Sequence, residues 1–296
     1  MSSRSRNWSL WPAPDDGNAV IGVVHLVWAP LGVDPLRTFL RSYHAHEAGV
    51  SHELIILLNG LDVVDRQARD AAREALLAEL RGTEHRVIEL ERAALDLSAY
   101  GESARRLQHD RLCFLNSYCA ILGENWLTYL SRALDEPDVG LVGASASWES
   151  QAEWVRGKRR YWLYQLVNVR HARRDFPRFP NPHIRTSAFM LARASALEVG
   201  MEETHDKHST YLLESGWASI TRQVEDRGLR AVVVGLDGRT YDIPEWPSSN
   251  TFRAGEQENL LIADNQTRDY QSSSSRRRRR LSRDSWGYRG GSAGSS

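Results

Sequence analysis

Between residues 20 and 144, short apolar segments alternate with longer segments whose apolar residues recur at helical spacing. A near-continuous apolar run predicts a strand that is buried on both faces of a parallel sheet. We expect strands over 20–28, 53–58, 85–90, 112–115 and 139–144, with helices over 34–48, 64–81, 98–108 and 126–136. Strands that alternate with helices imply βαβ units with right-handed crossovers. The chain therefore predicts a single α/β domain, with a Rossmann-type, mainly parallel sheet flanked by helices.

The alternation changes after residue 145. Residues 148–182 are rich in Trp, Tyr and Arg, and a strand (187–192), a helix (212–227) and a strand (229–234) are expected after them. Residues 245–267 are polar with scattered aromatics, and we expect them to wrap the surface or, less favoured, to cover the site as a lid. From residue 271 the chain becomes Ser-, Arg- and Gly-rich, a composition that buries too little apolar surface to offset its ordering entropy. We expect a flexible segment over 1–18, the domain over 19–270 and a disordered tail over 271–296.

Composition excludes several classes of protein. Lys and Arg total 38, as do Asp and Glu, so net charge selects no partner. The two cysteines, Cys113 and Cys119, exclude a disulfide framework and a cysteine-based zinc site. No G-x-G-x-x-G follows the first strand, which argues against a nicotinamide enzyme. Walker, G-x-S-x-G and H-E-x-x-H motifs are missing as well. With no run near 18 apolar residues and no signal-peptide pattern, we predict no transmembrane segment and a cytoplasmic location.

Small polar residues directly follow the strand expected at 112–115. The segment reads Arg111-Leu-Cys-Phe-Leu-Asn-Ser-Tyr118 and leads to a helix that begins near Trp126. In open α/β sheets, ligands bind outside the carboxyl ends of the strands. Asn116 and Ser117 are therefore candidate ligand-binding residues.

This segment, with Trp126-Leu127 and Val139-Gly-Leu-Val-Gly143, resembles the GT-A glycosyltransferases, family 2 in particular. In that family the strand ends in an Asp-x-Asp metal motif, whereas this chain has Asn116-Ser117-Tyr118. The resemblance covers about 20–240 and implies a GT-A-like fold that transfers a sugar from a nucleotide-sugar donor. It implies that the first strand and its loop (23–30) hold the nucleotide. The donor contacts that it implies are Asn59, Asp62, Asp96, Asn116 and Ser117.

The later part of the resemblance concerns the acceptor. Asn181-Pro-His-Ile-Arg-Thr-Ser-Ala-Phe-Met190 looks like the small-residue strand that frames the acceptor site, which implies that His183, Arg185 and Thr186 meet acceptor or diphosphate. Glu214 falls where the family has a Glu-Asp pair, so the resemblance implies that Glu214 is the catalytic base of an inverting transfer. The alternative interpretation is a carboxylate at a helix start, stabilised by the helix dipole.

Loss of the Asp-x-Asp acids affects the expected cofactor. Those carboxylates hold a divalent cation in the family, and Asn116 brings no charge. We keep Mg²⁺ or Mn²⁺ as a candidate cofactor and assign no metal ligand; basic residues within 156–185 could instead neutralise the diphosphate. The expected partners are the donor and an acceptor that is a glycan, a lipid or a small molecule. Alternatives are a nucleotidyltransferase and a non-catalytic nucleotide- or sugar-binding module, with nucleic-acid binding the least favoured.

Overall fold

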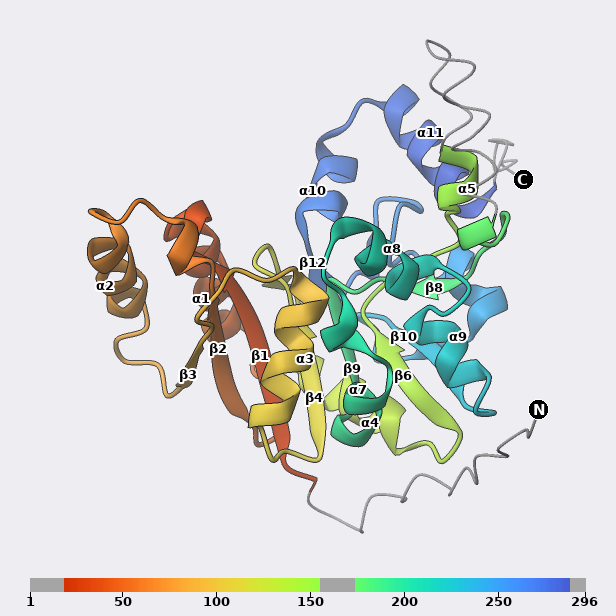
Figure 1. Ribbon diagram of the computed structural model, residues 1–296. Coiled ribbons are helices and arrows are strands. Elements are labelled where there is room, and N and C mark those ends of the chain that lie inside the picture. The colour runs from red at the N-terminus through yellow and green to blue at the C-terminus, as the bar shows by residue number, and fades with distance from the viewer. Residues whose placement is uncertain (1–18, 155–173, 288–296) are drawn as a thin grey trace, which may run out of the picture.

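The computed structural model describes residues 19–154 and 174–287 (Figure 1). Its main feature is an eight-stranded sheet with the order β11-β10-β6-β9-β4-β1-β2-β3. These strands are β1 (Ile21–Trp28), β2 (Glu53–Asn59), β3 (Arg86–Glu89), β4 (Arg111–Leu115), β6 (Val139–Gly143), β9 (Ala188–Ala192), β10 (Arg230–Val234) and β11 (Thr240–Tyr241).

Most neighbouring strands in this sheet are parallel. β1 is parallel to β2 and β4, β2 is parallel to β3, and β6 is parallel to β10. β9 lies between β4 and β6 and is antiparallel to both, and β11 is antiparallel to β10. The predicted fold class, a single α/β domain with a mainly parallel sheet, is confirmed.

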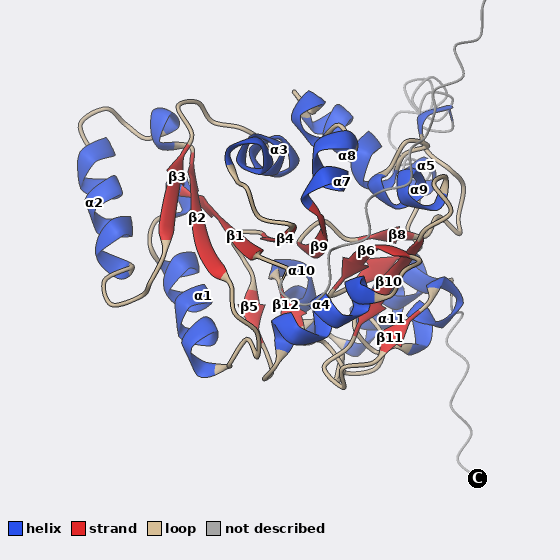
Figure 2. Ribbon diagram, turned by 90° about the horizontal axis from the view of Figure 1, so that it is seen from below, coloured by secondary structure: helices blue, strands red, loops and turns tan. Residues whose placement is uncertain are grey.

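Helices cover both faces of the sheet (Figure 2). Alternate residues of a strand point to opposite faces, so in β1 Val23 joins one core cluster and Val24 the other. The first cluster includes apolar residues of α1 (Asp34–Ala45), α2 (Arg69–Glu79) and α4 (Trp126–Asp135). The second includes residues of α3 (Asp96–Arg106), α7 (Arg193–Glu198), α8 (Lys207–Ser215) and α9 (Ile220–Glu225). Short 3-10 helices are η1 (Ala29–Leu31), η2 (Leu61–Val63), η4 (Met201–Glu203) and η5 (Ile243–Ser248).

The C-terminal part of the chain returns to the loop that follows β4. β12 (Ile262–Ala263) pairs with β5 (Ala120–Ile121), and β7 (Ala146–Ser147) pairs with β8 (His183–Ile184). The Arg268 guanidinium donates to the Tyr118 carbonyl at 2.8 Å. Trp246 and Phe252 are fully buried in the second core cluster. Residues 245–267 therefore belong to the core, and the expectation of a surface wrap is wrong.

The helix expected over 212–227 is interrupted. α8 ends at Ser215 and α9 begins at Ile220. A Cβ at Gly216 would lie 2.6 Å from the Leu212 carbonyl oxygen, so only glycine fits this exit from α8. The Ser219 hydroxyl then accepts from the backbone N–H of Arg222, which caps the start of α9.

The tail also differs from the expectation of disorder from residue 271. The structure has α10 (Asn265–Ser272) and α11 (Ser275–Trp286), and Trp286 is only 3% exposed. Its indole N–H donates to the Phe252 carbonyl at 2.7 Å, and its ring meets Trp148 edge to face at 5.9 Å. One aromatic residue in a polar segment thus anchors the helix. The segments 1–18 and 288–296 lie outside the described residues, as does most of the basic stretch 156–185.

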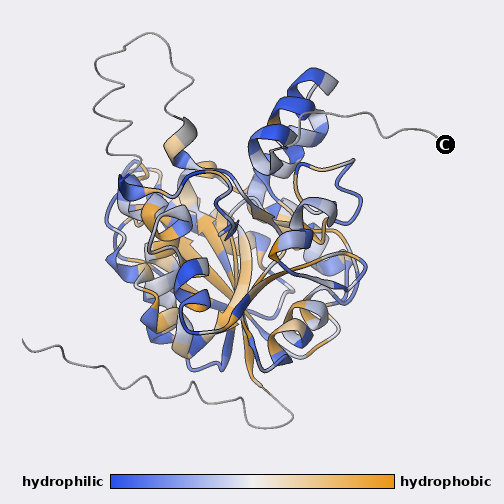
Figure 3. Cartoon of the chain, turned by 90° about the vertical axis from the view of Figure 1, so that its right-hand side faces the viewer, coloured by the Kyte–Doolittle hydropathy of each residue, from blue (hydrophilic) through white to orange (hydrophobic). Residues whose placement is uncertain are grey.

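Figure 3 shows mainly hydrophobic residues in the central strands and both hydrophilic and hydrophobic residues in the helices around them. In residues 19–154 and 174–287, no helix is both long enough and apolar enough to span a bilayer.

Candidate functional site

The carboxyl ends of the parallel strands lie along one edge of the sheet, and this edge collects the polar residues expected at a site. β1, β2 and β4 end there at Trp28, Asn59 and Leu115, and the antiparallel β9 begins there after Arg185 and Thr186. Such an edge is where ligands bind in open α/β sheets.

Asn59 positions the loop before α3. Its side-chain N–H donates to the Ala94 carbonyl at 2.7 Å, and its side-chain oxygen accepts the Ala94 N–H at 3.0 Å. With 1% exposure, this amide is committed to the protein. Asn59 thereby fixes the chain two residues ahead of Asp96. Asp62 is exposed in η2, and among the described residues no hydrogen bond or ion pair joins its side chain to the other candidates.

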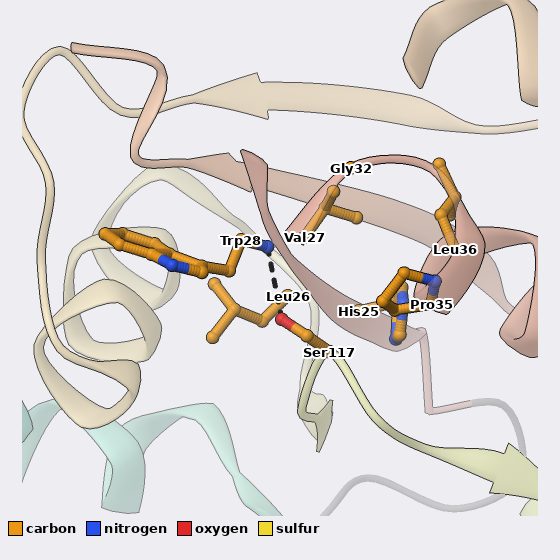
Figure 4. A pocket seen from close by; sticks show the side chains of 8 residues that line it. All are labelled: His25, Leu26, Val27, Trp28, Gly32, Pro35, Leu36 and Ser117. Carbon is orange, nitrogen blue, oxygen red and sulfur yellow. Dashed lines mark hydrogen bonds between the residues drawn. The ribbon is translucent and has the colours of Figure 1, made fainter. Parts of the chain in front are cut away.

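The two residues at the Asp-x-Asp positions shape the turn after β4. The Asn116 side-chain oxygen accepts from the Tyr118 N–H at 3.0 Å and from the Cys119 thiol at 3.4 Å. The buried Ser117 hydroxyl accepts the Trp28 N–H at 3.1 Å (Figure 4). The Asn116 oxygen therefore stabilises the turn that follows β4, and the Ser117 hydroxyl joins this turn to the end of β1.

A small hollow lies beside Ser117. It is shallow and open to solvent, and it encloses no space wide enough for a water molecule. Buried His25 lines it and stacks on Phe39 at 3.7 Å between ring centroids. Because burial lowers the pKa of His25 to about 3, its imidazole is neutral at pH 7. This hollow cannot hold a donor.

Trp28 presents a flat aromatic surface at the same edge. Its indole extends away from His25 and Leu36 in Figure 4 and is partly exposed. Gly60, which follows β2 with a φ of +80°, packs so closely on it that a Cβ there would lie 2.4 Å from the indole ring. Trp28 belongs to the segment 23–30 that the sequence led us to expect at the nucleotide, but the sequence did not indicate that its side chain would be a contact.

Glu214 and Thr186 are in contact. The Thr186 hydroxyl donates to one Glu214 carboxylate oxygen at 2.6 Å, which leaves the second oxygen available. Burial raises the pKa of Glu214 and the nearby Asp96 charge adds to this rise, while Thr186 and Arg185 oppose it. The expectation of a helix-start carboxylate is wrong, because Glu214 lies in the last turn of α8. The negative end of a helix dipole also disfavours ionisation there.

Asp96 faces this carboxylate from the first turn of α3. Its side chain is solvent-exposed, yet partial desolvation by surrounding protein raises its pKa. One turn later, Tyr100 is fully buried, and its hydroxyl has no hydrogen-bond partner among the described residues. Two carboxylates with raised pKa thus lie near each other at the edge of the sheet.

His183 lies on β8 and is held in one tautomer. Burial lowers the pKa of His183, so the ring is neutral at pH 7. Its Nδ1 is 2.8 Å from the Asn181 carbonyl and must donate to it, which leaves Nε2 as an acceptor. The Asn181 amide donates to the Ser215 carbonyl at 2.7 Å, so β8 and the end of α8 are joined next to Glu214.

Arg185 is neutralised by a residue that the sequence did not suggest. Its guanidinium lies 2.6 Å from an Asp264 oxygen, donates to Ser145 at 3.0 Å and stacks 4.0 Å from the centre of the Phe252 ring. Burial alone would raise the pKa of Asp264, but Arg185, the Thr267 N–H and the Ser187 hydroxyl together lower it. Arg253 also lies over the Phe252 ring, 4.7 Å from its centre, and pairs with Glu149 at 2.8 Å. Because Asp264 neutralises its charge, Arg185 has no free positive charge for the diphosphate binding that the sequence had led us to expect.

No cation-binding cluster accompanies these residues. Within the described ranges, no three His, Cys, Asp or Glu side chains come together as ligands for a metal ion. Asp96 and Glu214 lie near each other at this edge, and a third acid, Asp264, is paired with Arg185.

Sequence comparison finds no matching protein-family model and no matching curated protein. Among solved structures, the chain resembles a mannosyltransferase from Pyrobaculum calidifontis in complex with GDP-Man and Mn²⁺. Identity there is 12% and the TM-score 0.43, over 83% of this chain and 64% of that chain. It also resembles glucosyl-3-phosphoglycerate synthase from Mycobacterium tuberculosis in complex with Mn²⁺, UDP and phosphoglyceric acid (15%, 0.35, 60% and 57%). A third similar structure is the galactosyltransferase LgtC in complex with donor and acceptor sugar analogues (12%, 0.39, 67% and 68%).

The chain spans less than two thirds of the length of the first two proteins. These likenesses concern the course of the backbone, and a functional assignment depends on the side chains described above.

Proposed function

We propose that this chain is a nucleotide-sugar-dependent glycosyltransferase with a GT-A-like fold. The observation that carries the proposal is the Glu214 carboxylate, which has a raised pKa, is oriented through one oxygen by Thr186 and lies near Asp96 at the ligand-binding edge. A general base is most effective when its pKa approaches the working pH. The resemblance of residues 20–240 to family 2 enzymes supports the same reading.

Glu214 is the proposed base. It takes the proton of an acceptor hydroxyl while that oxygen forms a bond to the anomeric carbon of the donor sugar. The bond from this carbon to the donor phosphate breaks, and the nucleoside diphosphate leaves with the electron pair. Direct displacement inverts the anomeric configuration.

On the donor side, we assign the direct contacts to Trp28 and Asp96. The Trp28 indole offers a face on which a nucleobase can stack, a contact worth about 1–3 kcal/mol. Asp96 can accept hydrogen bonds from ribose or sugar hydroxyls. Asn59, Asn116 and Ser117 act by holding the loops that carry these two residues. Asp62 is the outermost proposed donor contact, on the exposed η2 turn.

On the acceptor side, we assign the contacts to His183 and Trp217, which belong to the segments next to Glu214. The neutral His183 imidazole offers an acceptor nitrogen. Trp217, three residues after Glu214, is 55% exposed and lies 5.1 Å under the Arg222 guanidinium. An exposed indole suits the apolar face of a sugar ring. A glycan acceptor therefore fits this surface better than a lipid or another small molecule.

The described residues do not fit a dedicated cation site, because the Asn116 oxygen is engaged in its own turn and no three His, Cys, Asp or Glu side chains come together there. Mn²⁺ accompanies the nucleotide in two of the similar structures. For this chain, Mg²⁺ or Mn²⁺ stays a proposal for the donor diphosphate, and we assign it no step.

The experiment compares wild type with Glu214→Gln and a matched control, Glu225→Gln, on donors that raise the melting temperature. Glu225 lies on α9, and partial desolvation raises the pKa of its carboxylate too, but its side chain is exposed and no hydroxyl of the residues that the structure describes donates to it. We expect the first variant to bind donor and lose transfer, and the control to keep both. Donor binding without transfer or hydrolysis by wild type would instead favour the non-catalytic binding module, which the engaged Asn116 and neutralised Arg185 make the second candidate.

A further inference from the structure

Helix α11 carries arginines along one of its faces. Arg276, Arg279, Arg280 and Arg283 are all exposed. Their spacing of three, four and seven residues places them on one stripe of the helix surface. Figure 3 shows this helix, which leads to the C-terminus, standing out from the body of the molecule with a hydrophilic surface.

The charge on this stripe is largely uncompensated. Arg277 pairs with Asp269 and Arg278 with Glu256, so these two tie the helix to the domain. In contrast, Arg276, Arg279 and Arg280 have no carboxylate partner among the described residues, and the Arg283 guanidinium reaches Asp284 only at 3.7 Å. The whole chain has a formal net charge of +0, so this concentration is a local feature.

The opposite side of the helix is fixed to the core. Buried Trp286 bonds to the Phe252 carbonyl, and the Ser285 carbonyl accepts the Trp148 N–H at 3.1 Å. Like charges at this spacing repel one another and disfavour a helix. The anchoring therefore maintains an arrangement of cations that the helix would not favour by itself.

We propose that this arginine face binds the acidic surface of a phospholipid bilayer. Phosphate groups suit guanidinium groups because the planar fork of donors matches their oxygens, and a flat anionic surface can meet the whole stripe at once. No aromatic side chain of α11 is exposed to stack on a base, which single-stranded nucleic acid would need. The stripe offers no Asn or Gln side chain to read adenine edges. Arginines can contact guanine edges as well as phosphate, so a nucleic-acid competitor belongs in the test.

The test uses the full-length chain and sedimentation with vesicles of phosphatidylcholine, with and without phosphatidylserine. We expect binding only to vesicles that contain phosphatidylserine, and its loss at high salt. Each arginine near such a surface contributes about fivefold. The triple variant Arg276→Gln/Arg279→Gln/Arg280→Gln should therefore bind about 100-fold more weakly.

A matched control removes the same charge elsewhere, through Arg66→Gln/Arg81→Gln/Arg132→Gln, and should bind like wild type. Equal weakening by both triple variants, or equal binding to vesicles without phosphatidylserine, would overturn the proposal. So would a duplex DNA or RNA competitor that the α11 face binds more tightly than vesicles. Unchanged circular dichroism and melting temperature of the variants show that each comparison concerns folded protein.

Discussion

The buried pair of Arg185 and Asp264 gives the most demanding test of the site. We predict that Asp264→Asn destabilises the protein by about 3–5 kcal/mol, because removing one partner leaves a buried, uncompensated charge. The two side chains are 9% and 2% exposed and 2.6 Å apart, so water cannot replace the lost carboxylate.

The choice of asparagine separates two roles of Asp264. Its other oxygen accepts the Thr267 N–H at 2.9 Å and caps α10, and asparagine caps a helix about as well as aspartate. Asp264→Ala should therefore cost about 1 kcal/mol more than Asp264→Asn. Arg185→Met keeps the apolar contact with Phe252, so the double variant Arg185→Met/Asp264→Asn should recover most of the loss.

The assay is urea unfolding of wild type, both single variants and the double variant, read as a double-mutant cycle. The pH dependence gives an independent check. Because the folded state lowers the pKa of Asp264 from its ordinary 3.8, the stabilisation is present above pH 3.8 and is lost as pH falls through the lowered pKa. The gap between wild type and Asp264→Asn should narrow in the same range. A gap below about 1 kcal/mol at pH 7 would refute the buried-charge reasoning.

Four further outcomes are expected. Glu214→Gln should lower turnover by a factor of about 10²–10⁴ without weakening donor binding, and unchanged turnover would make Glu214 structural. Because folding raises the pKa of Glu214, its charge lowers the stability of the protein as pH rises above 4.5, so the variant should melt no lower than wild type at pH 7. Thr186→Val removes the bond that holds down the pKa of Glu214, so the rise of kcat/KM with pH should move to higher pH; an unmoved profile would separate Thr186 from the base. Trp286→Ala should cost about 3–5 kcal/mol in urea unfolding, and a change below about 1 kcal/mol would mean that α11 does not dock. Trp28→Ala should weaken donor binding by about 1–3 kcal/mol in calorimetry, whereas unchanged donor affinity would mean that the nucleobase of the donor does not stack on Trp28.

The sheet could be predicted from sequence because its strands are local patterns. Val23, Val24 and their neighbours form an apolar run, which predicts a strand even when the strands that pair with it are not known. Glu214 and Thr186 could be named separately from motif positions, but their hydrogen bond depends on where α8 ends, which Gly216 sets by close contact with Leu212.

Contacts between distant segments could not be predicted. Asp264 lies far along the chain from Arg185, and nothing local to either residue indicates that they pair. Composition averaged over the tail hid Trp286, although a single buried aromatic is enough to hold a helix. Asp264 did show a local signal, since Asp264-Asn-Gln-Thr267 is a capping-box pattern that predicts a helix start.

The return of the C-terminal segment to the loop after β4 has a consequence for how the protein is made. Arg268, which holds the Tyr118 carbonyl, follows it by 150 residues. A ribosome that adds about 5–20 residues per second needs about 8–30 s to cover that distance. At the start of this interval β1 to β4 are already synthesised, while β6, β9, β10 and the buried aromatics of residues 245–267 have still to be added. The nascent chain therefore exposes an apolar sheet edge for seconds, and we expect the ligand-binding edge to be the last part of the domain to become ordered.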